Sequence, residues 1–169
     1  MRANGRISNA HQAHSVAVSV LTVSGLAVAG GPGPKATGMG TALRQASGGD
    51  QTAEFNFNAQ ERNGGDKGKV SVRVENDDGS LSQEFSGNVD CYYQDGNTAY
   101  ISGKVEKLER GTNRFDGRNF LIKAVDNGPV NDRFDWHRRG SAKGPFDCET
   151  ENPDRDFPVI EGEITVYAG

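Results

Sequence analysis

Residues 85–105 read FSGNVDCYYQDGNTAYISGKV and contain the pattern on which the fold prediction rests. Apolar side chains alternate with polar ones on both sides of Asp95-Gly96-Asn97, and this alternation is typical of two strands joined by a hairpin turn. The Asp-Gly pair suits such a turn because glycine adopts the positive φ angles that a tight hairpin needs. The segment therefore predicts two half-buried antiparallel strands.

The same period of two recurs through most of the chain after residue 51. Alternating apolar positions place apolar side chains on one face of a strand and polar side chains on the other. The predicted core-facing sets are Phe55, Phe57 and Ala59; Val70, Val72 and Val74; Phe85, Val89 and Cys91; Ala99, Ile101 and Val105; Phe120, Ile122 and Ala124; Phe134 and Trp136; and Ile160, Ile164 and Val166. Most connections are short, and parallel strands need long crossovers, so we expect an all-β domain with antiparallel pairing.

Three of these strands carry a glycine on the predicted core-facing phase. Gly87, Gly103 and Gly162 each stand in an apolar-x-Gly-x-apolar sequence. A glycine in mid-strand weakens strand pairing unless the backbone must bend or approach a neighbour closely. Glycines in the same relative position favour a sharply coiled sheet. We therefore expect a small antiparallel β-barrel of about seven to eight strands, with a β-sandwich as the alternative.

Residues 1–29 have the features of a secretory signal peptide. Arg2 and Arg6 give a positively charged start, an apolar run extends over residues 16–28, and residues 27–29 (AVA) match the small-x-small cleavage pattern. The apolar run is shorter than the roughly 20 residues that a membrane span needs. We therefore expect a secreted, extracellular product with no stable membrane insertion after cleavage.

Residues 30–51 are rich in glycine, alanine, proline and serine and show no periodicity, which predicts a flexible spacer. The folded β domain is then expected over residues 52–169. The chain has two cysteines, Cys91 and Cys148, and both fall in this domain. Exported domains commonly pair their cysteines, so we predict a disulfide between them.

Several short motifs follow one another in a fixed order along the β domain. They are Asp95-Gly96-Asn97-Thr98-Ala99 after the strand that holds Cys91, Val125-Asp126-Asn127-Gly128 before Asp132-Arg133-Phe134, and Gly162-Glu163-Ile164-Thr165-Val166 near the C-terminus. This order resembles a group of small exported β proteins from high-GC Gram-positive bacteria and the β module called post-COAP-1. The resemblance covers about residues 55–167 and implies an exported bacterial β fold. It implies no activity and assigns no catalytic residue.

The densest polar stretch of the domain is residues 126–133 (DNGPVNDR). Carboxylate and amide oxygens are the ligands that hard cations prefer, and the stretch offers them from Asp126, Asn127, Asn131 and Asp132. The order of these residues does not match an EF-hand loop. The same residue types also stabilise tight turns by accepting hydrogen bonds from the nearby backbone. We favour the turn interpretation and keep a cation site as the alternative.

A basic stretch follows at Trp136, His137, Arg138 and Arg139. His137 and Arg139 share the phase opposite to Trp136, so we expect them on the outer face of their strand. We favour the interpretation that this stretch is a solvated strand end. The alternative is a surface that contacts an acidic partner or a polysaccharide. The acidic stretch at residues 147–156 is expected to be a solvated loop, with weak calcium chelation by its carboxylates as the alternative.

Composition and motifs also limit the function classes. The formal net charge is −4. Loss of the signal peptide would remove Arg2 and Arg6 and no acidic residue, so the remaining domain is still more acidic. General nucleic-acid binding is therefore not expected. The chain has no phosphate-binding, dinucleotide-binding or Gly-x-Ser-x-Gly motif, so we expect no cofactor and assign no catalytic or metal-binding residue. The favoured interpretation is a non-catalytic extracellular binding module with a protein or polysaccharide partner. The alternatives are a lipocalin-like barrel with a small-molecule ligand, and a small hydrolase or cyclase, for which no motif speaks.

Overall fold

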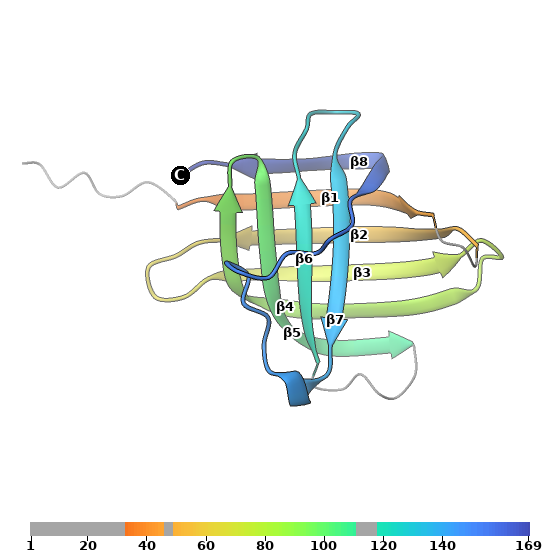
Figure 1. The fold of residues 1–169 in the computed structure, drawn as a ribbon, viewed down its shortest axis with the longest axis horizontal. Helices are drawn as coiled ribbons and strands as arrows, with labels where there is room; N and C mark the ends of the chain where they lie inside the picture. The colour runs from red at the N-terminus through yellow and green to blue at the C-terminus, as the bar shows by residue number, and fades with distance from the viewer. Residues whose placement is uncertain (1–32, 46–48, 111–117) are drawn as a thin grey trace, which may run out of the picture.

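The computed structural model describes residues 33–45, 49–110 and 118–169, and these form one closed antiparallel barrel (Figure 1). Each strand pairs with the next in the chain, and β1 pairs with β8 to close the ring. The strands are β1 Lys35–Arg44, β2 Gln51–Gln60, β3 Lys67–Asn76, β4 Leu81–Asp95, β5 Thr98–Arg110, β6 Asn119–Val125, β7 Arg133–Arg139 and β8 Phe157–Tyr167. The predicted all-β barrel is confirmed, and the β-sandwich alternative is excluded. The predicted signal peptide, residues 1–29, lies outside the described residues.

Strand β1 lies within the stretch that we predicted to be a flexible spacer, so that prediction is wrong for residues 35–44. β1 pairs with β2 along its whole length and with β8 on its other side. Its core-facing residues are small: Ala36 and Ala42 are fully buried, and a Cβ added at Gly38 would lie within 3.0 Å of the Phe57 ring. Small residues carry the alternation here because aromatic rings from other strands fill the adjacent space. Among the described residues, the barrel therefore begins with β1 rather than near residue 52.

Aromatic side chains fill the interior of the barrel. Phe55, Phe57, Phe85, Phe134 and Trp136 are all buried, as their strand phase predicts. The rings of Phe55 and Phe134 stack with 4.1 Å between their centroids, and Phe57 and Trp136 contact the same group. Such rings bury large apolar areas and dominate the energy of a small core. The barrel is thus held together by a packed aromatic interior.

Two of the three predicted core-facing glycines lie as expected. Gly87 on β4 and Gly103 on β5 are buried, and the ring of Phe120 lies against both. A Cβ added at either glycine would come within 3.0 Å of that ring and of a carbonyl oxygen on the facing strand. The absence of a side chain lets β4 and β5 approach closely while β4 curves around the barrel (Figure 1).

The third glycine, Gly162, shares the core-facing phase of the buried Ile164, as predicted, but it is exposed rather than buried. It has a φ of +97° and pairs with Gly40 of β1 beside a bulge. Because the pairing passes from Glu161 directly to Val159, Ile160 has no partner on β1. A bulge of this kind reverses the phase of the strand beyond it. Ile160, which we predicted in the core, is accordingly 57% exposed.

The connection between β7 and β8, residues 140–156, crosses the outer face of the barrel, and we call it the strap. The predicted disulfide between Cys91 of β4 and Cys148 of the strap is present, with 6.1 Å between the Cα atoms. Two barrel side chains also donate hydrogen bonds to strap carbonyls: Ser102 Oγ to Phe146 at 3.1 Å and Asn119 Nδ2 to Gly144 at 2.6 Å. The strap contains the short 3-10 helix η1 (Ser141–Lys143). No helix among the described residues has the length and apolar character of a membrane span.

Candidate functional site

The strap and β7 border a groove with a volume of about 670 Å3. It is lined by residues 135–139 of β7, by strap residues that include Lys143, Glu151 and Asp154, and by Arg44 at the end of β1. Arg44 lies over the rings of Trp136 and Phe157, which form part of the same lining. The groove therefore combines charged side chains with aromatic surface.

The groove exists because β7 and β8 diverge soon after they meet. Among the described residues they pair only at Arg133↔Pro158 and Phe134↔Phe157. On its other side β7 pairs with β6 as far as Arg139. The strap therefore lies beside the part of β7 that β8 leaves uncovered.

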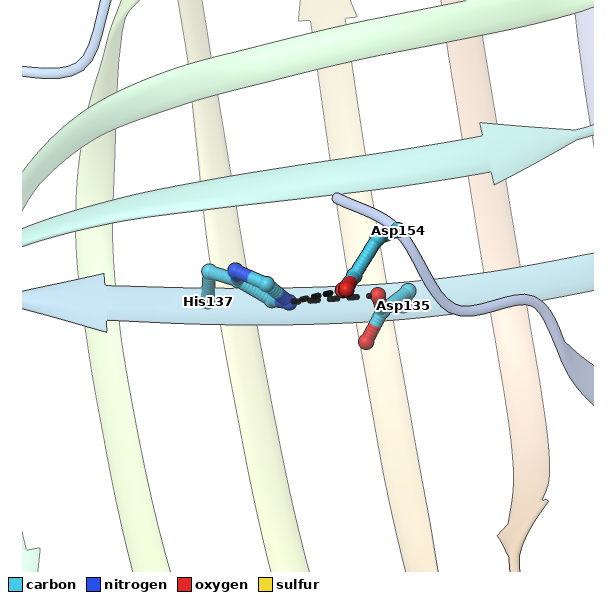
Figure 2. A group of neighbouring side chains, drawn as sticks. All are labelled: Asp135, His137 and Asp154. Atoms are coloured by element: carbon cyan, nitrogen blue, oxygen red, sulfur yellow. Dashed lines mark ion pairs between the residues drawn. The ribbon is translucent and has the colours of Figure 1, made fainter. Parts of the chain in front are cut away.

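Three potential ligand side chains meet in this groove (Figure 2). Asp135 and His137 are two residues apart on β7, so they project from the same outer face. The strap adds Asp154. His137 Nε2 lies 3.4 Å from Asp135 Oδ2 and 3.8 Å from Asp154 Oδ1, and the three potential ligand atoms lie within 4.8 Å of one another. The exposed fractions of their side chains differ widely: 2% for Asp135, 40% for His137 and 81% for Asp154.

Asp135 is held in place by the backbone around it. Its Oδ1 accepts a hydrogen bond from the Trp136 N–H at 2.8 Å, and its Oδ2 accepts one from the Arg155 N–H at 3.2 Å. Burial raises the pKa of the Asp135 carboxyl, because it penalises the charged form, and the nearby His137 and these N–H donors oppose that effect. The carboxyl is thus a fixed group whose negative charge is costly to bury.

The predicted basic stretch does not form one exposed patch. His137 and Arg139 lie on the outer face as expected, but Arg139 is ion-paired with Glu151 and lies over the Phe146 ring, 3.8 Å from its centroid. Arg138 projects from the other face of β7, where burial, reinforced by the positive charge of Arg118, lowers its pKa to about 10. Of the three residues, His137 is the one placed in the Asp–His–Asp cluster.

The acidic stretch of the strap is attached to the barrel rather than simply solvated. Glu151 pairs with Arg139, Asp154 lies beside His137, and Asp156 pairs with Lys123 of β6 at 2.9 Å. Even so, the groove lining carries five cationic side chains against three carboxylates, in a chain with a net charge of −4. The groove is therefore a locally positive surface on an acidic protein.

The loop from Asp126 to Asp132 is occupied by the backbone in the way that the turn interpretation predicts. Asp126 Oδ1 accepts the Gly128 N–H at 3.2 Å, and Asp132 Oδ1 accepts the Asn127 N–H at 2.9 Å. The second oxygens of the two aspartates accept N–H groups of β8: Asp126 from Val166 at 3.1 Å and Asp132 from Ile164 at 2.8 Å. The two carboxylates thus link the β6–β7 turn to a part of β8 that does not pair with β7.

Asn127 and Asn131 take part in the same turn. Asn127 Nδ2 donates to the Asn131 carbonyl at 3.1 Å, and Asn127 Oδ1 accepts a hydrogen bond from Asn97 Nδ2 at 2.9 Å. Amide side chains engaged in this way hold two neighbouring turns together at one end of the barrel. These contacts favour a structural role for all four residues.

Calcium is expected to leave the melting temperature of the protein unchanged, because the four carboxylate oxygens of Asp126 and Asp132 already accept N–H groups. Thermal unfolding of the full chain with and without millimolar calcium measures this. Asp126→Ala is expected to lower the melting temperature equally in both buffers, since it removes two accepted hydrogen bonds. A calcium-dependent rise that Asp126→Ala abolishes would instead favour the cation site.

A second hollow, of about 630 Å3, lies on the outer face of β1, β2 and β8. Thr37 and Met39 of β1, Asn56 of β2 and Glu163 of β8 line it. Met39 is 67% exposed there. This hollow has no cluster of cationic side chains, so it serves below as the comparison surface.

Sequence reasoning missed Asp135 and Arg44 as groove residues, and it placed Asp154 in an acidic stretch without joining it to His137. The D-x-H pattern at residues 135–137 places a carboxylate and an imidazole on one strand face, and this signal was available. Nothing in the sequence indicated that residue 154 would return to the same face, because that depends on the path of the strap. No family model, no curated protein and no solved structure matches this chain.

Proposed function

We propose that this chain is an exported, non-catalytic binding module that holds an anionic, carboxylate-bearing partner in the groove between β7 and the strap. The observation that carries the proposal is the local excess of cationic side chains in the groove of an otherwise acidic protein. A positive groove attracts anions and orients them, and the remainder of an acidic surface repels them. The signal-peptide features of residues 1–29 and the disulfide both suit an extracellular location.

The cations that would contact such a partner are Lys143 and Arg155. Both belong to the strap, both are exposed, and both line the groove. Arg139, in contrast, is engaged with Glu151, and its side chain is only 19% exposed. We therefore assign anion contact to the strap cations and a structural role to Arg139.

The packed interior supports an outer binding surface over the lipocalin-like alternative. The rings of Phe55, Phe57, Phe85 and Phe134 occupy the space that an interior ligand would need. Among the described residues that line the groove there is no serine, threonine or cysteine, so nothing there supports covalent hydrolysis through such a nucleophile. Turnover of an ester or glycoside that depends on His137 would favour the hydrolase alternative.

The wild-type protein is expected to bind polygalacturonate or poly-glutamate, and not neutral dextran. The first polymer carries its carboxylates on sugar units and the second on amino-acid units. Isothermal titration at low and high salt measures this, and the affinity should fall as salt rises because the contacts are ionic. The double variant Lys143→Glu/Arg155→Glu should weaken binding by at least about tenfold, since each lost ionic hydrogen bond is worth about 1.5–3 kcal/mol.

The matched control is Arg62→Glu/Lys67→Glu, which changes the charge equally at the other end of the barrel, between β2 and β3. It is expected to bind as the wild type does, apart from a small long-range effect. Binding of one polymer alone identifies the source of the carboxylates as sugar or peptide. Equal losses in the two double variants, or no binding of either polymer, would contradict the proposal.

A further inference from the structure

The cluster of Asp135, His137 and Asp154 has a chemistry of its own, which does not depend on an anionic partner. An imidazole nitrogen and two carboxylate oxygens from separate residues converge on one point, as Figure 2 shows. Two of the ligands come from a strand of the barrel and one comes from the strap. A group bound between them would join these two parts of the molecule.

We infer that Asp135, His137 and Asp154 form a binding site for a divalent transition-metal ion of the Zn²⁺ type. Imidazole nitrogen and carboxylate oxygen are both ordinary ligands of this ion. Calcium and magnesium fit poorly, because they take six or more oxygen ligands and do not select imidazole. Three protein ligands leave at least one coordination position for water or for a carboxylate of a bound molecule.

Two of the three separations between ligand atoms are close to those of tetrahedral coordination, and the third is at most 4.8 Å. Metal–ligand bonds of about 2.0–2.2 Å at tetrahedral angles place neighbouring ligand atoms roughly 3.4 Å apart. His137 Nε2 and Asp135 Oδ2 are already separated by 3.4 Å, and His137 Nε2 and Asp154 Oδ1 by 3.8 Å. Asp154 is the most exposed member, so it is free to rotate toward the other two.

The geometry around Asp135 also suits a bound cation. Its side chain is only 2% exposed and one of its carboxylate oxygens lies 3.4 Å from His137 Nε2, so a cation held between the two would offset the cost of burying the charge. The N–H groups of Trp136 and Arg155 fix the orientation of the carboxyl, as outer-shell hydrogen bonds do at metal sites. Because the carboxylate is already oriented, it favours the bound metal ion over the metal ion hydrated in solution.

Five cationic side chains line the groove and oppose a metal ion: Arg44, Arg138, Arg139, Lys143 and Arg155. Arg139 is neutralised by Glu151, and Lys143 and Arg155 are exposed to solvent. Solvent screening reduces the repulsion from exposed charges, whereas the metal would lie in direct contact with two carboxylates.

Zinc titration of the EDTA-treated full chain at neutral pH tests the inference. We expect one ion to bind per chain with loss of affinity in His137→Gln and Asp154→Asn of at least about 100-fold, because even outer-shell changes cost roughly 10–100-fold. Zinc should also raise the melting temperature of the wild type by several degrees, since it joins the strap to β7. Replacement of Zn²⁺ by Co²⁺ should give visible absorption bands, whereas Ca²⁺ should produce neither effect.

The matched control is Asp156→Asn, which removes the same charge two residues further along the strap, where the carboxylate contacts Lys123 instead of His137. It should keep the zinc affinity of the wild type. His11 and His14 remain in the His137→Gln variant, so any zinc that they bind persists there and can be subtracted. An unchanged affinity in His137→Gln, or an equal loss in Asp154→Asn and Asp156→Asn, would overturn the inference. The polymer titrations described above are done without metal, so failure of either proposal can be recognised separately.

Discussion

Replacing Cys91 and Cys148 together by alanine is expected to lower the free energy of unfolding by about 4 kcal/mol. The bridge joins residues 57 positions apart, so its loss greatly increases the conformational freedom of the unfolded chain. In the folded protein the same bond fixes the strap to β4. Urea unfolding followed by tryptophan fluorescence measures the effect, because Trp136 is the single tryptophan of the chain and lies in the core.

Reduction of the wild type provides the control for this change. With the bridge reduced, the wild type should unfold at the same urea concentration as the double alanine variant. The variant should also lose affinity for the polyanions, because five of the twelve residues that line the groove belong to the strap. A double variant within about 1 kcal/mol of the oxidised wild type would contradict the structural role assigned to the bridge.

Gly103→Ala is expected to lower the free energy of unfolding by about 3 kcal/mol or more. The added methyl group would lie within 3.0 Å of the Asn88 carbonyl oxygen and of the Phe120 ring. The ring can shift, but the carbonyl belongs to the backbone of β4, so the two strands must separate. Chemical denaturation compares the variant with the wild type.

Gly140→Ala is the matched control for this substitution. Gly140 has a φ of −65°, and a Cβ added there would have no other atom within 4 Å. The control should therefore be as stable as the wild type. Equal stability of Gly103→Ala and Gly140→Ala would show that close approach of β4 and β5 is not needed.

The period of two was enough to predict the barrel and most of its interior. Phe55, Phe85 and Phe134 are buried where their phase places them. The prediction failed at β1, where Ala36 and Gly38 alternate as inward-facing residues without a large apolar side chain. A search for alternating large apolar side chains does not detect a strand such as β1, because aromatic rings of other strands fill the space next to its inner face.

The outer face shows the second limit of the sequence pattern. Leu121 and Asp135 stand on the outward phase of their strands, yet both are buried. Their burial results from residues 140–156, which return across β4–β7 and which have no periodicity of their own. Alternation distinguishes the two faces of a strand, but it does not tell which part of the outer face a long connection will cover. The candidate site lies in that covered region, so only its individual residues were visible in the sequence.

Binding on the outer face is the central claim of this account, and mapping of a bound anion tests it most directly. Oligogalacturonate is titrated into ¹⁵N-labelled protein, and the amide signals are followed by NMR. The account predicts that the largest shifts occur at His137, Lys143 and Arg155, which line the groove. Shifts confined to Met39 and Glu163 in the hollow over β1 and β8, or to the aromatic core, would contradict it.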